Sequence, residues 1–227
     1  MILAILGILL LAAITLPQMW VKRVMRQYST PDDRYELSGG ELARIILNRY
    51  GLNHVGVETT KEGDHYDPED RTVRLSEPYF SGRSLAAITI AAHEVGHAIQ
   101  HDTDYRPMAL RSRLVGKTRG AEKLGAMILM ASPLFAVISR RPLPALILFL
   151  AGLASMGMPA LVHLATLPVE FDASFNRALP LLKAGGHLHD GDEGAARKLL
   201  KAAALTYVAS SLSSLLNFWK WLRVLRR

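Results

Sequence analysis

The chain has 227 residues, enough for one domain or two small ones; 50% of them are hydrophobic and 21% are charged. It contains no cysteine, which excludes disulfides and thiolate zinc sites. The formal charge of +7 could suit nucleic acid, but the basic residues cluster beside apolar segments, at Lys22–Arg26, Arg111–Lys123 and Lys220–Arg227. That placement favours contact with anionic lipid head groups and predicts no nucleic-acid partner.

The chain begins with an uncharged, mostly apolar segment, residues 1–21. At about 1.5 Å per residue it is long enough to cross roughly 30 Å of hydrocarbon. It lacks the early basic residue and the small-residue cleavage site of a signal peptide, and Lys22 and Arg23 follow it directly. We therefore expect residues 1–21 to be a retained N-terminal transmembrane anchor.

Residues 29–123 are predicted to form a small α+β region. Ser38 and Glu41 have the spacing of a capping box before a helix over 41–50. Val55–Thr60 and Thr72–Leu75 have the composition of short strands, joined by a turn-rich segment. The second strand could offer its edge to an extended substrate.

The segment 84–101 contains the pentad HEVGH at His93–His97. Ser84 is a suitable N-cap for an alanine-rich run, which predicts a helix. Helical positions four apart share a face, so the two histidines can bind one metal, with Glu94 beside the open coordination position as general base. This arrangement is typical of zinc proteases; the alternative is two histidines satisfied within a helical core.

Two further uncharged runs, Leu124–Ser139 and Pro142–Val169, flank Arg140-Arg141 and predict a transmembrane hairpin over 124–169. The C-terminal segment 202–227 combines an apolar helix with a basic tail, and its apolar part could cross the membrane or lie buried against the other helices. The lysine and arginine bias predicts a multi-pass protein of the cell membrane with the pentad on the cytoplasmic side.

A catalytic zinc site needs a third protein ligand. His101 suits the end of the helix, His163 lies within an apolar run, and Glu122 has the surroundings of a charged membrane rim. Glu170 follows the second apolar run, so two crossings return it to the face that carries the histidines. We expect it to open a third-ligand helix and loop over 170–201.

Four motifs carry a family resemblance: DHYDP (64–68), VRLSE (73–77), SLAAITIAAHEVGHAIQ (84–100) and LPVEFDAS (167–174). From about Ser38 to Ala178 the chain resembles the YugP-like family of neutral membrane zinc metallopeptidases. The last motif also resembles, more distantly, the Glu-x-x-Ala-Asp motif of HtpX-type and CAAX prenyl proteases. The resemblance implies Glu170 as ligand in a gluzincin-type core. Where those relatives have an aspartate that supports a histidine, this chain has Ser174, and helical spacing turns Asp172 to another face.

These features predict a mainly α, integral membrane helical bundle with a small α+β cytoplasmic portion that carries the zinc helix. The expected function is a membrane-embedded endopeptidase in which His93, His97 and Glu170 hold Zn²⁺ and Glu94 is the general base. Arg177, two helical turns after Glu170, is the first candidate for stabilising the oxyanion. Weaker candidates for that role are His65 and Tyr66.

The expected partners are a membrane-associated peptide or protein substrate and the lipid bilayer. Two alternative functions remain open at this point. One is a non-catalytic membrane scaffold in which zinc is structural, although such a site normally has four protein ligands and no use for Glu94. The other is a metal hydrolase that acts on a lipid-linked substrate.

Overall fold

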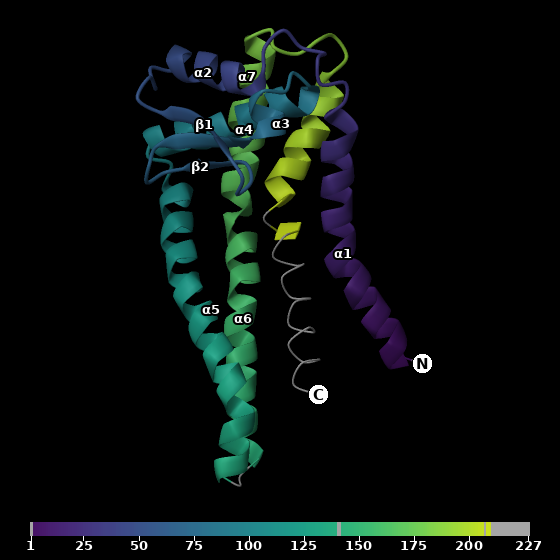
Figure 1. The fold of residues 1–227 in the computed structure, drawn as a ribbon, viewed down its shortest axis with the longest axis vertical. Coiled ribbons are helices and arrows are strands. Elements are labelled where there is room, and N and C mark those ends of the chain that lie inside the picture. The colour runs from purple at the N-terminus through teal and green to yellow at the C-terminus, as the bar shows by residue number, and fades with distance from the viewer. Residues whose placement is uncertain (1, 140–141, 207, 210–227) are drawn as a thin grey trace.

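A pair of long helices extends from a cluster of shorter elements in the computed structural model (Figure 1). The structure describes residues 2–139, 142–206 and 208–209. The helices α5 (Arg106–Ser139) and α6 (Pro142–Phe171) run side by side, and α1 (Ile2–Tyr28) extends from the same cluster. The start of α5 therefore lies near the end of α6. The expected turn at Arg140-Arg141 falls outside the described residues.

Two helices of the cluster begin as the sequence predicts. The helix α2 (Gly39–Arg49) has a full capping box, in which Ser38 Oγ accepts from the Glu41 N–H at 3.2 Å and Glu41 Oε2 accepts from the Ser38 N–H at 2.8 Å. The helix α4 (Leu85–Asp102) begins at Ser84, whose hydroxyl accepts from the Ala87 N–H. Residues 85–100 of α4 are all buried, so this helix forms the centre of the core.

A three-stranded sheet lies beside α4 in the cluster. Its strands are β1 (Gly56–Thr60), β2 (His65–Asp67) and β3 (Thr72–Ser76), in the order β1-β3-β2. The expected strands correspond to β1 and β3, but β2 lies in the segment that we expected to be a turn. Because β3 pairs with β1 in parallel and with β2 antiparallel, it is the central strand. The expectation that β3 offers an edge to a substrate is therefore wrong.

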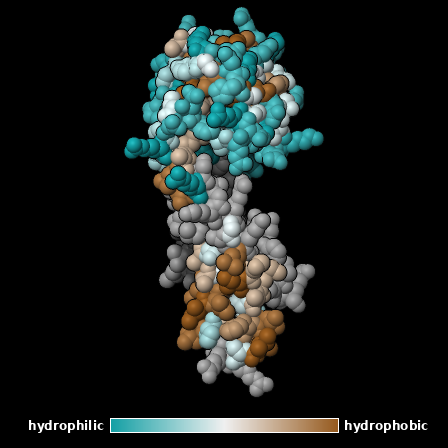
Figure 2. Space-filling view, turned by 90° about the vertical axis from the view of Figure 1, so that its left-hand side faces the viewer, coloured by the Kyte–Doolittle hydropathy of each residue, from teal (hydrophilic) through white to brown (hydrophobic). Residues whose placement is uncertain are grey.

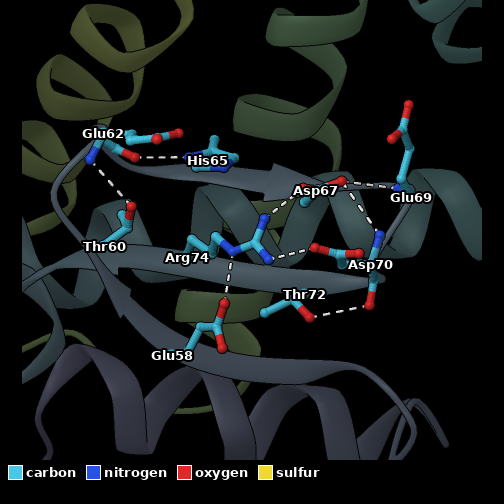
Figure 3. Close-up of polar contacts among 10 residues, drawn as sticks. Glu58, Thr60, Glu62, His65, Asp67, Glu69, Asp70, Thr72 and Arg74 are labelled. Carbon is cyan, nitrogen blue, oxygen red and sulfur yellow. Dashed lines mark hydrogen bonds and ion pairs between the residues drawn. The ribbon is translucent and has the colours of Figure 1, made fainter.

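Arg74 of β3 explains why the short strand β2 is held in the sheet (Figure 3). Its guanidinium pairs with Glu58 of β1 at 2.6 Å, with Asp70 of the β2–β3 turn at 2.5 Å, and with Asp67 of β2. A single exposed ion pair contributes only about 0–1 kcal/mol, but this planar group fixes three chain segments at once.

The chain continues from α6 without a break into a π-helix, η1 (Asp172–Ala178), and then into α7 (Leu179–Ala184). A last described helix occupies residues 193–206. The π-helix packs tightly on α4 at Gly96, where an added Cβ would lie 2.7 Å from the carbonyl oxygen of Ala173. Glycine at position 96 is therefore what allows α4 and η1 to approach so closely.

The polar residues gather on the cluster, whereas the far end of the long hairpin exposes apolar side chains (Figure 2). These exposed side chains include Leu134, Ile138, Leu143 and Ile147. A membrane span needs about 20 consecutive, mostly apolar residues. Among the described residues, no helix combines that length with sufficient apolar character.

The expectation of an integral membrane bundle is therefore wrong for the part of the chain that the structure describes. The apolar run in α5 is only the second half of a longer helix, whose first half carries Arg106, Arg111 and Arg113. The multi-pass location, and the cytoplasmic side assigned to the pentad, rested on the expected spans at 1–21 and 124–169.

Candidate metal site

Three of the expected site residues meet in the core. His93 and His97 lie one turn apart on α4, and Glu170 lies near the end of α6. The Oε2 atom of Glu170 is 3.2 Å from Nε2 of His97 and 3.4 Å from Nε2 of His93. All three side chains are buried, and one ligand atom from each lies within 4.8 Å of the others. Although α5 and α6 separate them in sequence, the antiparallel hairpin returns Glu170 to the histidines.

The orientation of His97 is fixed by Gln100, which lies one turn further along α4. The Gln100 amide nitrogen donates to the carbonyl oxygen of Val169 and to Oδ2 of Asp172, both at 2.8 Å. Both N–H donors of the amide are therefore used, and its oxygen faces Nδ1 of His97 at 2.9 Å. Since this oxygen can only accept, Nδ1 of His97 must carry a proton.

The orientation of His93 is fixed in the same way by Ser174 of η1. The Ser174 hydroxyl lies 3.0 Å from Nδ1 of His93 and 3.1 Å from the carbonyl oxygen of Leu200. A hydroxyl has one hydrogen, and a carbonyl oxygen can only accept, so that hydrogen points to Leu200. The hydroxyl oxygen then accepts from Nδ1–H of His93. Ser174 thus acts as an acceptor for His93 at the position where the relatives named above have an aspartate.

As a result, the Nε2 lone pairs of both histidines point toward the carboxylate oxygen of Glu170. Three acceptors that face one another are stable only with a cation between them, so the arrangement suits a proton or a metal ion. A charge-assisted hydrogen bond between nitrogen and oxygen is about 2.7–2.9 Å long. The edge of a tetrahedral zinc site with bonds of about 2.0–2.2 Å is about 3.4 Å. The observed separations of 3.2 and 3.4 Å are closer to the edge of a metal site, so these residues fit zinc.

The electrostatics of the two buried glutamates differ. Burial raises the pKa of Glu94 to about 7, and the carboxylates of Glu170 and Asp64 act in the same direction against the effect of His93. Burial would also raise the pKa of Glu170, but with a proton between Glu170 and the histidines, the charge at His97 and His93 together with that of Arg111 holds the pKa of that carboxyl well below its usual range. Glu170 is therefore held as a carboxylate, whereas Glu94 can exchange a proton near neutral pH.

Arg111 is a site residue that sequence reasoning missed. Its Nη1 lies 2.8 Å from Oε1 of Glu170. The sequence placed Arg111 in a basic cluster for lipid head groups, because nothing in its local pattern points to a partner on another helix. Gln100 was also missed, although its position three residues after His97 on the same helix was a usable signal.

The π-helix changes the positions that α-helical spacing gave to Asp172 and Arg177. In a π-helix, residues five apart are bonded, and the N–H of Leu179 accordingly donates to the Ser174 carbonyl. Asp172 and Arg177 also lie five apart, and Nε of Arg177 donates to Oδ2 of Asp172 at 2.9 Å. Asp172 thereby contacts Gln100 behind His97, instead of facing away from the site.

The other residues considered from the sequence have different partners or are not described. The Tyr66 hydroxyl bonds with Nδ1 of His101 at 2.8 Å, and His101 lies in the last turn of α4 as expected. Nδ1 of His65 lies 2.7 Å from the carbonyl oxygen of Gly63. The side chains of Glu122 and His163 fall outside the described part of the chain.

Comparisons with known proteins identify the family of this chain. The family model described as "Putative neutral zinc metallopeptidase" matches residues 1–226. A protein of Bacillus subtilis (strain 168) named "Putative membrane protease YugP" is 36% identical over 209 residues, which cover 91% of this chain and 89% of that protein. No solved structure matches the chain with significance. The chain therefore belongs to the family of neutral zinc metallopeptidases.

Proposed function

We propose that the protein is a zinc-dependent endopeptidase of the gluzincin type, with His93, His97 and Glu170 as the metal ligands. The observation that carries the proposal is the convergence of two Nε2 lone pairs and one carboxylate oxygen on a single buried point. Bound zinc would supply a water molecule of lowered pKa and polarise the substrate carbonyl. Three protein ligands leave a position for that water, as in catalytic zinc sites.

Glu94 is the proposed general base. It follows His93 on α4 and is buried, so bulk water does not compete for its carboxylate. In this role Glu94 takes a proton from the attacking water and passes it to the leaving amine. A structural zinc site would have no use for such a group, which is why the role of Glu94 separates the endopeptidase from a scaffold.

Arg177 remains the proposed donor to the oxyanion of the tetrahedral intermediate. Its Nε donates to Asp172, and its two terminal nitrogens carry four further N–H groups. The ring of Tyr105 lies 5.7 Å from the guanidinium carbon, which adds a second contact that orients the group. Together these contacts hold the arginine in a defined orientation, as a preorganised donor requires.

The proposed substrates are peptides or proteins. The name of the Bacillus subtilis relative, which calls it a membrane protease, adds the proposal that these substrates are associated with a membrane. Lys22, Arg23 and Arg26 near the end of α1 are suited to contact anionic lipid head groups. Flotation with anionic and neutral vesicles tests this part, and equal recovery with both would contradict it.

The decisive experiment compares the wild type with Glu94→Gln, measuring casein or peptide cleavage together with bound zinc. Because Glu94 is proposed as base and not as ligand, Glu94→Gln should lose hydrolysis by about 100-fold or more and keep its zinc. Glu69→Gln, an exposed glutamate in the turn before β3, is the matched control and should keep both. Loss of zinc in Glu94→Gln would make Glu94 a ligand, and a zinc-loaded wild type without peptidase activity would favour the scaffold.

A further inference from the structure

The two oxygens of the Glu170 carboxylate have different partners. Oε2 faces both histidines, at 3.2 and 3.4 Å. Oε1 instead lies 2.8 Å from Nη1 of Arg111. Within the described residues Oε1 accepts no well-aligned hydrogen bond, so its link to Arg111 is an ion pair. The carboxylate is therefore held at both ends, with one oxygen directed to the metal position and the other to a cation on another helix.

The fold brings Arg111 to this position through the long hairpin. Arg111 lies in the first part of α5 and Glu170 in the last part of α6, and the two helices run side by side (Figure 1). The Arg111 side chain is 17% exposed and that of Glu170 is 1% exposed. An ion pair with so little access to water is screened much less than a surface pair, so it restrains the carboxylate strongly.

We propose that Arg111 is a positioning residue, which keeps Glu170 as a one-oxygen ligand and so preserves the coordination position that the attacking water needs. This inference rests on the proposed function. A glutamate can bind a metal through one oxygen or through both, and a second bound oxygen would raise the number of ligand atoms from four to five and crowd the position of the water. For Oε1 to reach the metal, the carboxylate would have to give up its ion pair with Arg111, which has little access to water.

A purely structural ion pair between α5 and α6 is the competing explanation. Such a pair would contribute to the stability of the metal-free and metal-loaded protein alike. It would not change the number of atoms that coordinate the metal. The experiment must therefore observe coordination directly, and not only stability or activity.

Cobalt(II) in place of zinc provides that measurement, because its visible absorption weakens as the coordination number rises from four to five. The comparison uses Arg111→Met, which removes the charge, and Arg113→Met, which removes an exposed arginine two residues further along α5. We expect Arg111→Met to lose about half or more of the cobalt absorption and to bind zinc about tenfold more weakly in a chelator competition. Arg113→Met should match the wild type in both.

Arg111→Lys provides a rescue test. It restores a positive charge beside Oε1 without the planar guanidinium, so most of the wild-type cobalt absorption should return. If Arg111→Lys behaved like Arg111→Met, the proposal that charge at Oε1 sets the coordination would be overturned.

The wild-type protein gives a test that does not depend on the folding of a variant. In a crystal structure of the zinc-loaded wild type, Oε1 should remain on Arg111, and Oε1 within bonding distance of the metal would overturn the inference. A wild type that takes up neither zinc nor cobalt would overturn the proposed function itself. A wild type that binds cobalt, beside an Arg111→Met protein with the same spectrum and affinity, would overturn only the role of Arg111.

Discussion

Ser174 has a single hydroxyl hydrogen and two hydrogen-bonding neighbours, and this determines which ring nitrogen of His93 carries the proton. Because the hydrogen belongs to the Leu200 carbonyl, the histidine must donate from Nδ1 and present Nε2 as a lone pair. Gln100 imposes the same tautomer on His97 through an amide whose two N–H donors are already used. Both imidazoles are thus held by neutral partners in the tautomer that the proposed metal site needs, where the resemblance to other proteases suggested an aspartate.

The first prediction tests the role of the Ser174 hydroxyl with the variant Ser174→Ala. The variant leaves Nδ1–H of His93 and the Leu200 carbonyl without the hydroxyl, so it should lose about 1–3 kcal/mol of unfolding free energy. Zinc affinity should fall about 10- to 100-fold, because a partner behind a ligand is lost. Urea unfolding and chelator competition measure the two effects.

Ser132→Ala is the matched control for that experiment. Ser132 is also buried, but its hydroxyl donates to the Leu129 carbonyl within its own helix at 2.9 Å. Its replacement should leave zinc affinity unchanged. If Ser174→Ala lost stability but bound zinc as tightly as the wild type, Ser174 would be a packing residue only.

At the scale of elements, the site depends on the contact between α4 and η1. Sequence spacing assumed an α-helix after Glu170, and on that assumption Asp172 faced away from the site. The π-helix places Asp172 behind Gln100 and pairs it with Arg177 five residues on. No propensity rule distinguishes seven residues of π-helix from α-helix in advance. In the structure, Ala173 and Ser174 of this segment contact α4.

The second prediction concerns Gly96, where α4 and η1 touch. A Cβ at this position would lie 2.7 Å from the Ala173 carbonyl oxygen, which is backbone and cannot rotate away. Gly96→Ala should therefore push η1 from α4, with a cost of about 1–3 kcal/mol in unfolding free energy and weaker zinc binding. Thermal unfolding and zinc content measure both.

Gly120→Ala separates this effect from the general preference of helices for alanine. Gly120 lies within α5, and nothing is within 4 Å of its added Cβ. That replacement should stabilise the protein by up to about 1 kcal/mol. A Gly96→Ala protein as stable as the wild type would show that the close approach is not required.

For the whole molecule, the sequence predicted the parts whose signals are local. The pentad and the N-cap at Ser84 predicted α4, and the capping box at Ser38 predicted α2. The two uncharged runs around Arg140-Arg141 also predicted that two long helices would run antiparallel to each other. Two features that the sequence did not predict depend on contacts between distant segments: the strand β2 is held by Arg74, and Arg111 meets Glu170 only in the folded hairpin. The expected membrane spans were wrong for another reason, because no described helix is long and apolar enough to cross a membrane.

The last prediction follows from this long-range construction. Two of the proposed ligands lie on α4 and the third at the end of α6, so a bound metal would join His97 to a residue 73 positions further along the chain. A ligand that binds only the folded state stabilises it by about 4 kcal/mol at a free concentration 1,000 times its dissociation constant. For a chain of this size, that corresponds to roughly 8–16 °C in Tm.

We therefore expect the Tm of the zinc-loaded wild type, followed by circular dichroism, to fall by about that much when a chelator removes the metal. Glu170→Ala lacks the ligand that reaches across the hairpin, so its Tm should hardly respond to the chelator. Glu122→Ala removes the rival ligand candidate and should respond like the wild type. If the two variants exchanged these behaviours, Glu122 would be the third ligand, and the convergence of Glu170 with the histidines would have to be explained by a proton shared among them instead of a metal.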